Sequence, residues 1–185
     1  AELARPLGAA LALAVAAVAS GVPGRDRADP VLLVPVPSSR AALRARGRDH
    51  VGELTGRAVA ELQAAGVPAA EARLLRRSGR AADSAGLSAA QRRANLAGTF
   101  RARPASGPLP ARALLVLVDD VVTSGATLTE AARALSAVHR TGEPPVLAAV
   151  VAATPRSGSR PFVHRARESR RPDPAEPPGR LSGPG

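Results

Sequence analysis

The sequence predicts an α/β fold with a doubly wound, mainly parallel sheet, followed by a polar tail. Two apolar runs, at residues 31–34 and 113–118, lack polar alternation, which is typical of parallel strands covered on both faces. Helical apolar spacing flanks both runs, as expected for alternating strands and helices. With 185 residues, 45% of them hydrophobic, the chain can bury one ordinary core. We therefore expect a helix in 1–29, one α/β domain over 30–153 and a disordered tail over 154–185.

The first expected helix covers about residues 3–19. Its apolar positions recur at helical spacing, and 21–24 (Gly-Val-Pro-Gly) ends the run. The stretch 7–20 also has features of a secretion-signal core. It is rich in alanine and has only Arg5 as a basic leader, so a buried amphipathic helix is the preferred interpretation. The run is too short to span a bilayer, and we expect no membrane insertion. Because the chain opens without methionine, we interpret this helix as the remnant of a truncated region.

The middle of the chain begins with the strand 31–34, which leads into an irregular loop of prolines and serines at 35–40. Asp49 is a suitable cap for a second helix, which Gly66 and Pro68 end. The apolar face of that helix comprises Val51, Leu54, Ala58, Val59 and Leu62.

A short apolar element at 72–75 is expected next, and a mobile loop follows it over 76–86. Ser88 to Gln91 matches a capping box that opens a helix to about Asn95. Thr99 and Phe100 are expected to begin a brief strand, and 104–110 to form a linker or hairpin tip.

The strongest predicted strand, 113–118, stops at Asp119 and Asp120, and 123–127 then forms a tight turn into a helix. The predicted face of this helix comprises Leu128, Ala131, Ala132, Leu135 and Val138. A last strand at 146–151 precedes the tail.

The turn after the strongest strand has the composition of a phosphate site: Thr123, Ser124, Gly125, Ala126 and Thr127. Hydroxyls and successive backbone N–H groups can wrap a phosphate monoester, and Gly125 allows close approach of the backbone. A helix that begins near Ala126 adds unpaired N–H donors and partial positive charge. In open α/β sheets, ligands bind at this carboxyl edge of the strands.

Asp119 and Asp120 would repel a phosphate, so we expect them to accept hydrogen bonds from ribose hydroxyls, directly or through Mg²⁺. The simpler alternative is that two acidic residues end a strand and Thr123 or Ser124 caps a helix. The apolar strand, the two carboxylates and the hydroxyl-rich turn occur together in this order, which favours a site for a phosphorylated sugar. A Walker B strand also ends in two aspartates. All 26 basic residues are arginine, however, so no Walker A lysine exists to complete a nucleotide-triphosphatase site.

The formal net charge of +11 suits an anionic partner such as a phosphorylated metabolite or a nucleic acid. From residue 155 onward, seven arginines against three acidic residues contribute +4 of it, in a Pro- and Gly-rich tail. The chain has no cysteine, so it forms no disulfide and no thiolate metal site, and a cytoplasmic location is the default expectation.

The sequence resembles the type I phosphoribosyltransferases and, within them, the ComF family, which is associated with DNA uptake in competent bacteria. The resemblance covers about residues 7–153. Four segments carry it: 34–37 (Val-Pro-Val-Pro), 44–50, 86–100 and the turn with its preceding strand end, 118–127. The last segment is specific for the superfamily, and the first three in this order are typical of ComF.

The resemblance implies that the turn binds the 5′-phosphate of phosphoribosyl pyrophosphate (PRPP) and that Asp119 and Asp120 are the catalytic carboxylates. It assigns the pyrophosphate to Pro37, Ser38, Ser39 and Arg40. It also makes Arg76, Arg77 and Arg80 part of a flexible loop that closes over the substrate. Mg²⁺ is expected mainly through PRPP, with no metal site built by the protein alone.

The expected activity is a phosphoribosyl transfer to an unidentified base or amine. The resemblance leaves two further kinds of partner open: a second copy of the chain in a homo-oligomer, and DNA-uptake proteins. A non-catalytic module that senses PRPP or a nucleotide uses the same loop and stays an alternative. A general Arg-rich nucleic-acid binder is the lesser alternative, because the two phenylalanines are the only aromatic residues available for base stacking.

Overall fold

The computed structural model describes residues 4–39, 43–44, 47–78, 91, 95–105, 107–136 and 145–154. The chain divides into two units, 1–155 and 156–185, and the second lies outside the described residues. The helices are α1 (Ala4–Ser20), α3 (His50–Ala64) and α5 (Ala126–Ser136). The strands are β1 (Val31–Pro35), β2 (Ala69–Glu71), β3 (Leu75–Arg77), β4 (Phe100–Ala102), β5 (Leu114–Val122) and β6 (Leu147–Ala153).

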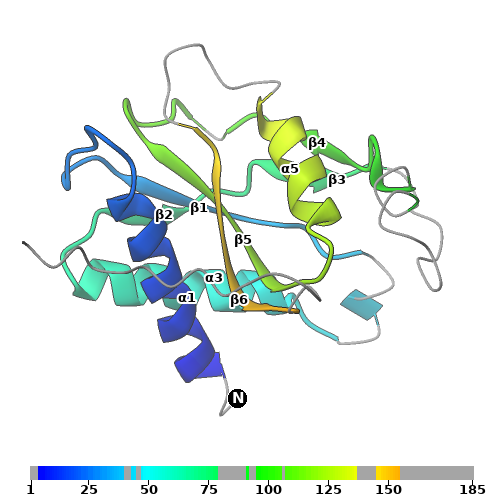
Figure 1. Ribbon diagram of the computed structural model, residues 1–185, viewed down its shortest axis with the longest axis horizontal. Helices are drawn as coiled ribbons and strands as arrows, with labels where there is room; N and C mark the ends of the chain where they lie inside the picture. Colours follow the sequence, from blue (N-terminus) through cyan, green and yellow to red (C-terminus); the bar gives the residue numbers. More distant parts are fainter. Residues whose placement is uncertain are drawn as a thin grey trace, which may run out of the picture. The chain divides into compact units, whose positions relative to one another are not determined.

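The main sheet has the order β2-β1-β5-β6, and every neighbouring pair is parallel. Alternate residues of β5 face opposite sides, because successive side chains of a strand point to opposite faces. Leu114 and Val116 pack in one core with α1 and α3, whereas Leu115 and Leu117 pack in another with α5 and β4. Figure 1 shows α5 on the other side of the sheet from α1 and α3. The expected α/β class with a mainly parallel sheet is therefore confirmed.

Helix α1 belongs to the same core as the sheet. Leu11 and Val15 are buried against α3 and the strands, so the expectation of a buried helix is confirmed. The boundary expected at residue 29 lies within the first unit. Among the described residues, no helix is long and apolar enough to cross a membrane.

Helix α3 begins where its cap predicts. The Asp49 side chain accepts a hydrogen bond from the Gly52 N–H at 3.1 Å, which satisfies one of the donors that the helix start leaves unpaired. Val51, Leu54 and Leu62 are buried, which confirms most of the expected apolar face.

The region around residues 69–77 differs from the expected single apolar element. It forms two short strands, β2 on the edge of the main sheet and β3, which pairs antiparallel with β4. Arg76 and Arg77 were expected in a mobile loop but belong to β3. A three-residue strand is too short to show the alternation of apolar and polar residues that predicts a strand. Pairing with a neighbouring strand determines where such a strand forms. Arg80 and the capping box at 88–91, apart from Gln91, lie outside the described residues.

Strand β5 runs four residues beyond its expected end. Asp119 and Asp120 therefore lie within the strand, which corrects the expectation that they terminate it. The reason is that β6 continues alongside, with Asp119 opposite Val150 and Val122 opposite Ala153. Neighbouring strand length is a tertiary effect that the local sequence does not contain.

Candidate functional site at the carboxyl edge of the sheet

The ends of β1 and β5 bring two of the predicted segments to one edge. Pro35, the last residue of β1, lies opposite Val118, and the Val36 N–H donates to the Val118 carbonyl oxygen at 2.9 Å. The chain then leaves the sheet through 37–39, whose side chains are half-buried, next to the position at which Asp119 follows Val118. Pro37, Ser38 and Ser39 thus lie at the same sheet edge as the two aspartates, whereas Arg40 is outside the described residues.

The two aspartates are half-buried, and each accepts a hydrogen bond from the next backbone amide. Asp119 Oδ1 accepts from the Asp120 N–H at 3.0 Å, and Asp120 Oδ1 accepts from the Val121 N–H at 2.8 Å. Strand geometry sends their side chains to opposite faces, and Asp119 continues the row of Leu115 and Leu117 on the α5 side. The strand therefore offers one carboxylate on each side of its end.

The turn between β5 and α5 has the geometry of a helix start. Gly125 has φ +74°, a left-handed conformation that favours glycine. Its carbonyl oxygen accepts from the Thr129 N–H at 2.9 Å and from Thr129 Oγ1 at 3.0 Å, so α5 begins directly after it. The predicted helix start near Ala126 is confirmed.

The first turn of α5 offers donors for an anion. An α-helix supplies no internal acceptor for its first four N–H groups. Ser124 Oγ accepts from the Ala126 N–H at a long 3.4 Å. Thr123 is exposed, and Ser124 and Thr127 are half-buried, so solvent reaches these hydroxyl-bearing side chains. The partial positive charge of the helix start also favours an anion.

Glu130 on α5 is a charged residue that the expected apolar face did not include. It is 8% exposed, and its Oε1 accepts from the Gly98 N–H at 2.7 Å. Arg133 donates to both carboxylate oxygens, at 2.6 and 2.8 Å. The Arg133 guanidinium is the main cause that lowers the pKa of Glu130 below its ordinary value, and the Gly98 amide adds to it. Glu130 thereby ties α5 to the segment that leads into β4.

A sequence signal for Glu130 does exist. Ala126, Glu130 and Ala134 follow one another at i+4 spacing, and all three are buried along one row of α5. A charged residue within such a row, three residues before an arginine, indicates a satisfied buried carboxylate.

Two hollows lined by described residues are distinct from the turn. One, of about 430 Å³, lies beside α5, β3 and β4, and the other, of about 490 Å³, lies between β2 and the segment 103–110. Neither is lined by a residue of 119–127. The strand ends and the helix start define the candidate site.

The comparisons with known proteins leave the family open. A scan of this chain against models of protein families finds no match, and a search of curated proteins finds none either. The four motif segments therefore carry the family resemblance alone.

Proposed function

We propose that the chain is a phosphoribosyltransferase-like protein that binds PRPP with Mg²⁺ and transfers the phosphoribosyl group to a nitrogen acceptor. The observation that carries the proposal is the junction of β5 and α5. There, β5 bears two carboxylates shortly before its end at Val122, and Gly125 in a left-handed conformation directly precedes α5. Membership of the ComF family and a link to DNA uptake belong to the same proposal, since the motifs at 34–37, 44–50, 86–100 and 118–127 support them.

Each part of PRPP has a chemically suitable partner at this edge. The 5′-phosphate fits the N–H groups and hydroxyls of 123–127, and the ribose hydroxyls fit Asp119 and Asp120 as acceptors. Val121 is 50% exposed and gives the site an apolar surface beside these carboxylates. The pyrophosphate fits Pro37, Ser38 and Ser39, at the neighbouring strand end, and the resemblance adds Arg40, which lies outside the described residues.

Mg²⁺ is implied as a companion of PRPP. Among the described residues, no group of three or more potential ligands forms a metal site. The donor set still fits, because Mg²⁺ in phosphate sites commonly uses one or two carboxylates and takes its other oxygens from substrate phosphates and water. When bound, Mg²⁺ neutralises charge on the leaving pyrophosphate.

The proposed reaction is a substitution at the anomeric carbon of PRPP. A bond from the acceptor nitrogen to this carbon forms, the bond to the pyrophosphate oxygen breaks, and pyrophosphate departs with the electron pair. The nitrogen loses its proton to solvent. The protein contributes position and charge, because the turn holds the 5′-phosphate while Asp119 and Asp120 hold the ribose and face the positive charge of an oxocarbenium-like transition state.

The test of the activity is pyrophosphate release from PRPP in the presence of Mg²⁺, measured across a panel of purines, pyrimidines and amines. At least one acceptor should give turnover that Asp119→Asn/Asp120→Asn abolishes. Binding of PRPP without release for any acceptor would instead support a PRPP-sensing module, which uses the same turn. Absence of PRPP binding would contradict both.

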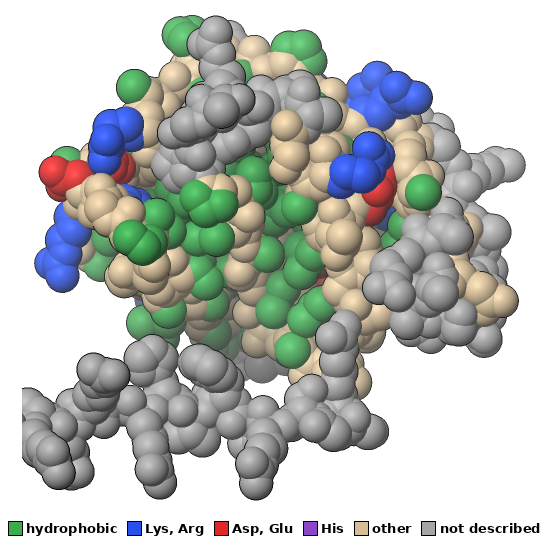
Figure 2. All heavy atoms as spheres, turned by 45° about the horizontal axis from the view of Figure 1, so that its top comes forward, with side chains coloured by type: hydrophobic (Ala, Val, Ile, Leu, Met, Phe, Trp, Pro, Cys, Tyr) green, Lys and Arg blue, Asp and Glu red, His purple; other side chains and the backbone are tan. Residues whose placement is uncertain are grey.

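The nucleic-acid alternative has less support. On the face shown in Figure 2, arginines stand in separate groups, some of them beside acidic side chains, and hydrophobic side chains lie across the middle. A nucleic-acid groove needs continuous positive charge and aromatic faces. Phe100, the aromatic residue among those described, is only 1% exposed.

A further inference from the structure

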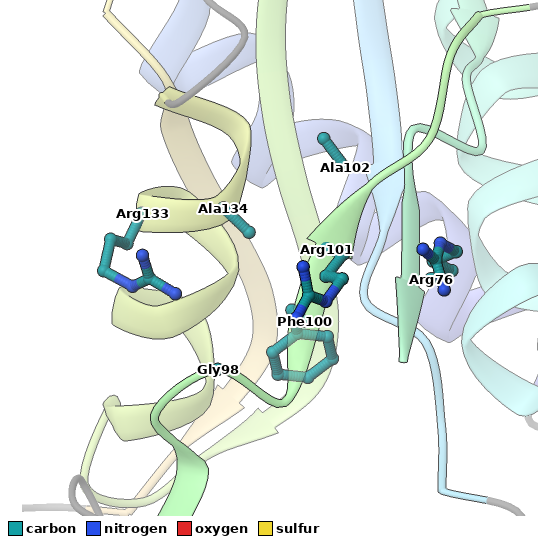
Figure 3. A pocket seen from close by; sticks show the side chains of 7 residues that line it. All are labelled: Arg76, Gly98, Phe100, Arg101, Ala102, Arg133 and Ala134. Carbon is teal, nitrogen blue, oxygen red and sulfur yellow. The ribbon is translucent and has the colours of Figure 1, made fainter. Parts of the chain in front are cut away.

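Positively charged side chains are among the residues that line the 430 Å³ hollow beside α5, β3 and β4. Three arginines line it: Arg76 on β3, Arg101 on β4 and Arg133 on α5. Figure 3 shows them spread across the opening, Arg101 between the other two, with Phe100 and Ala134 among the lining residues. No expectation from the sequence assigned a site to this combination.

Arg76 and Arg101 lie directly opposite each other in the antiparallel pair. Hydrogen bonds on either side fix this register, from the Ser78 N–H to the Thr99 oxygen and from the Arg103 N–H to the Leu74 oxygen. Directly opposite residues share a face, and like charges in that position are destabilising. Both side chains are exposed, and neither forms an ion pair within the described part of the chain. An anion bound between the two guanidinium groups would remove this repulsion.

Arg133 is fixed in place by its contact with Glu130. Two hydrogen bonds to the Glu130 carboxylate use two of the five N–H donors of the guanidinium, which leaves three for another partner. The three arginines carry three positive charges, and the Glu130 carboxylate carries one negative charge. The net charge around the hollow is therefore +2. Arg77 adds a further positive charge nearby, with its guanidinium carbon 5.2 Å from the centre of the Phe100 ring.

We propose that this hollow binds a small phosphorylated metabolite through Arg76, Arg101 and Arg133, at a site separate from the turn at 123–127. Guanidinium groups match phosphate oxygens in geometry and charge. The volume of about 430 Å³ is in the range of small-molecule sites. Arg133 lies seven residues along α5 from Ala126, roughly 10 Å at 1.5 Å per residue, so one small phosphate does not occupy both places. Because Phe100 is buried, the hollow offers no stacking face for a nucleic-acid strand.

The test uses inorganic pyrophosphate as the probe, titrated into the full chain by calorimetry in low salt with EDTA. Arg76→Gln/Arg101→Gln should raise the dissociation constant of this binding event about tenfold or more, because it removes two charge-assisted contacts. Arg27→Gln removes an exposed arginine between α1 and β1 and serves as the matched control. This variant should bind pyrophosphate with the same dissociation constant as the wild type. The double variant leaves residues 37–40 and 119–127 of the proposed PRPP site unchanged, so a binding event that is lost with it belongs to the hollow.

Arg101→Glu separates loss of charge from loss of folding. It places a carboxylate opposite Arg76, so the melting temperature should rise or stay equal while pyrophosphate binding at the hollow disappears. If every pyrophosphate-binding event of the wild type persists within twofold in Arg76→Gln/Arg101→Gln, or if the wild type does not bind pyrophosphate, the proposal is overturned. A short oligothymidine that binds more tightly than pyrophosphate and depends on the same two arginines would also overturn it, in favour of a nucleic-acid surface.

Discussion

The contact of Glu130 with Gly98 allows a quantitative prediction for Glu130→Gln. The Gln side chain keeps the shape and one acceptor but converts a charge-assisted hydrogen bond to the Gly98 N–H, 2.7 Å long, into a neutral one. Charge-assisted bonds contribute about 1.5–3 kcal/mol and neutral ones about 0.5–1.5, so the loss is about 1 kcal/mol. The ion pair with Arg133 adds to this loss, although solvent around the exposed guanidinium reduces its contribution. For a folded part of this size, the melting temperature should fall by about 2–4 °C.

The assay is thermal unfolding followed by far-ultraviolet circular dichroism, since the chain has no Trp or Tyr to report by fluorescence. Glu61→Gln, an exposed position on α3, is the control and should change the free energy of unfolding by less than about 0.5 kcal/mol. A melting temperature of Glu130→Gln within 1 °C of the wild type would refute the assigned role of the carboxylate.

The pH dependence follows from the lowered pKa of Glu130. A carboxyl whose pKa in the folded state lies below its ordinary value near 4.5 contributes stability above that value. This stability is lost as pH falls through the folded-state pKa. The difference between wild type and Glu130→Gln should therefore be largest at neutral pH and shrink below about pH 4.5. A difference that grows on acidification would contradict the assignment.

Three glycines give further predictions. A β-carbon at Gly8 meets Arg57 Cβ at 2.6 Å, so Gly8→Ala forces α1 from α3 and should cost about 1–3 kcal/mol by chemical denaturation. Gly56→Ala on α3 places a β-carbon with nothing within 4 Å and should instead stabilise the fold by about 0.5–1 kcal/mol. If both substitutions changed the free energy of unfolding in the same direction, the close packing of α1 on α3 would be contradicted. Gly125→Val places a branched side chain at φ +74°, so the turn must rearrange. The variant should bind PRPP at least about tenfold more weakly in calorimetry. Unchanged affinity would show that the turn does not bind PRPP.

The sequence predicts the long elements of the fold well. Asp49 as the cap of α3, the apolar runs of β1 and β5 and the start of α5 after Gly125 are local features, and local chemistry decides them. They also suffice to place 37–39 and 119–127 at one edge, because parallel strands end at the same side of a sheet.

The remainder depends on contacts that are distant in sequence. Strand β5 extends to Val122 because β6 pairs with it, and β3 includes Arg76 and Arg77 because β4 lies opposite. The role of Glu130 depends on Gly98, 32 residues away. The spacing of Glu130 and Arg133 indicates a satisfied carboxylate, but no window of neighbouring residues identifies Gly98 or the partner strands, so these distant contacts cannot be predicted from local patterns.

The most direct measurement is calorimetry of PRPP with Mg²⁺ on the wild type and on Asp119→Asn/Asp120→Asn. The wild type should bind with one site per chain, and the variant should bind at least about a hundredfold more weakly, because each carboxylate loses its charge-assisted bonds to ribose hydroxyls. Equal melting temperatures of the two proteins would show that folding is unaffected. Equal affinity, or no binding by the wild type, would contradict the assignment of this sheet edge to a phosphorylated pentose.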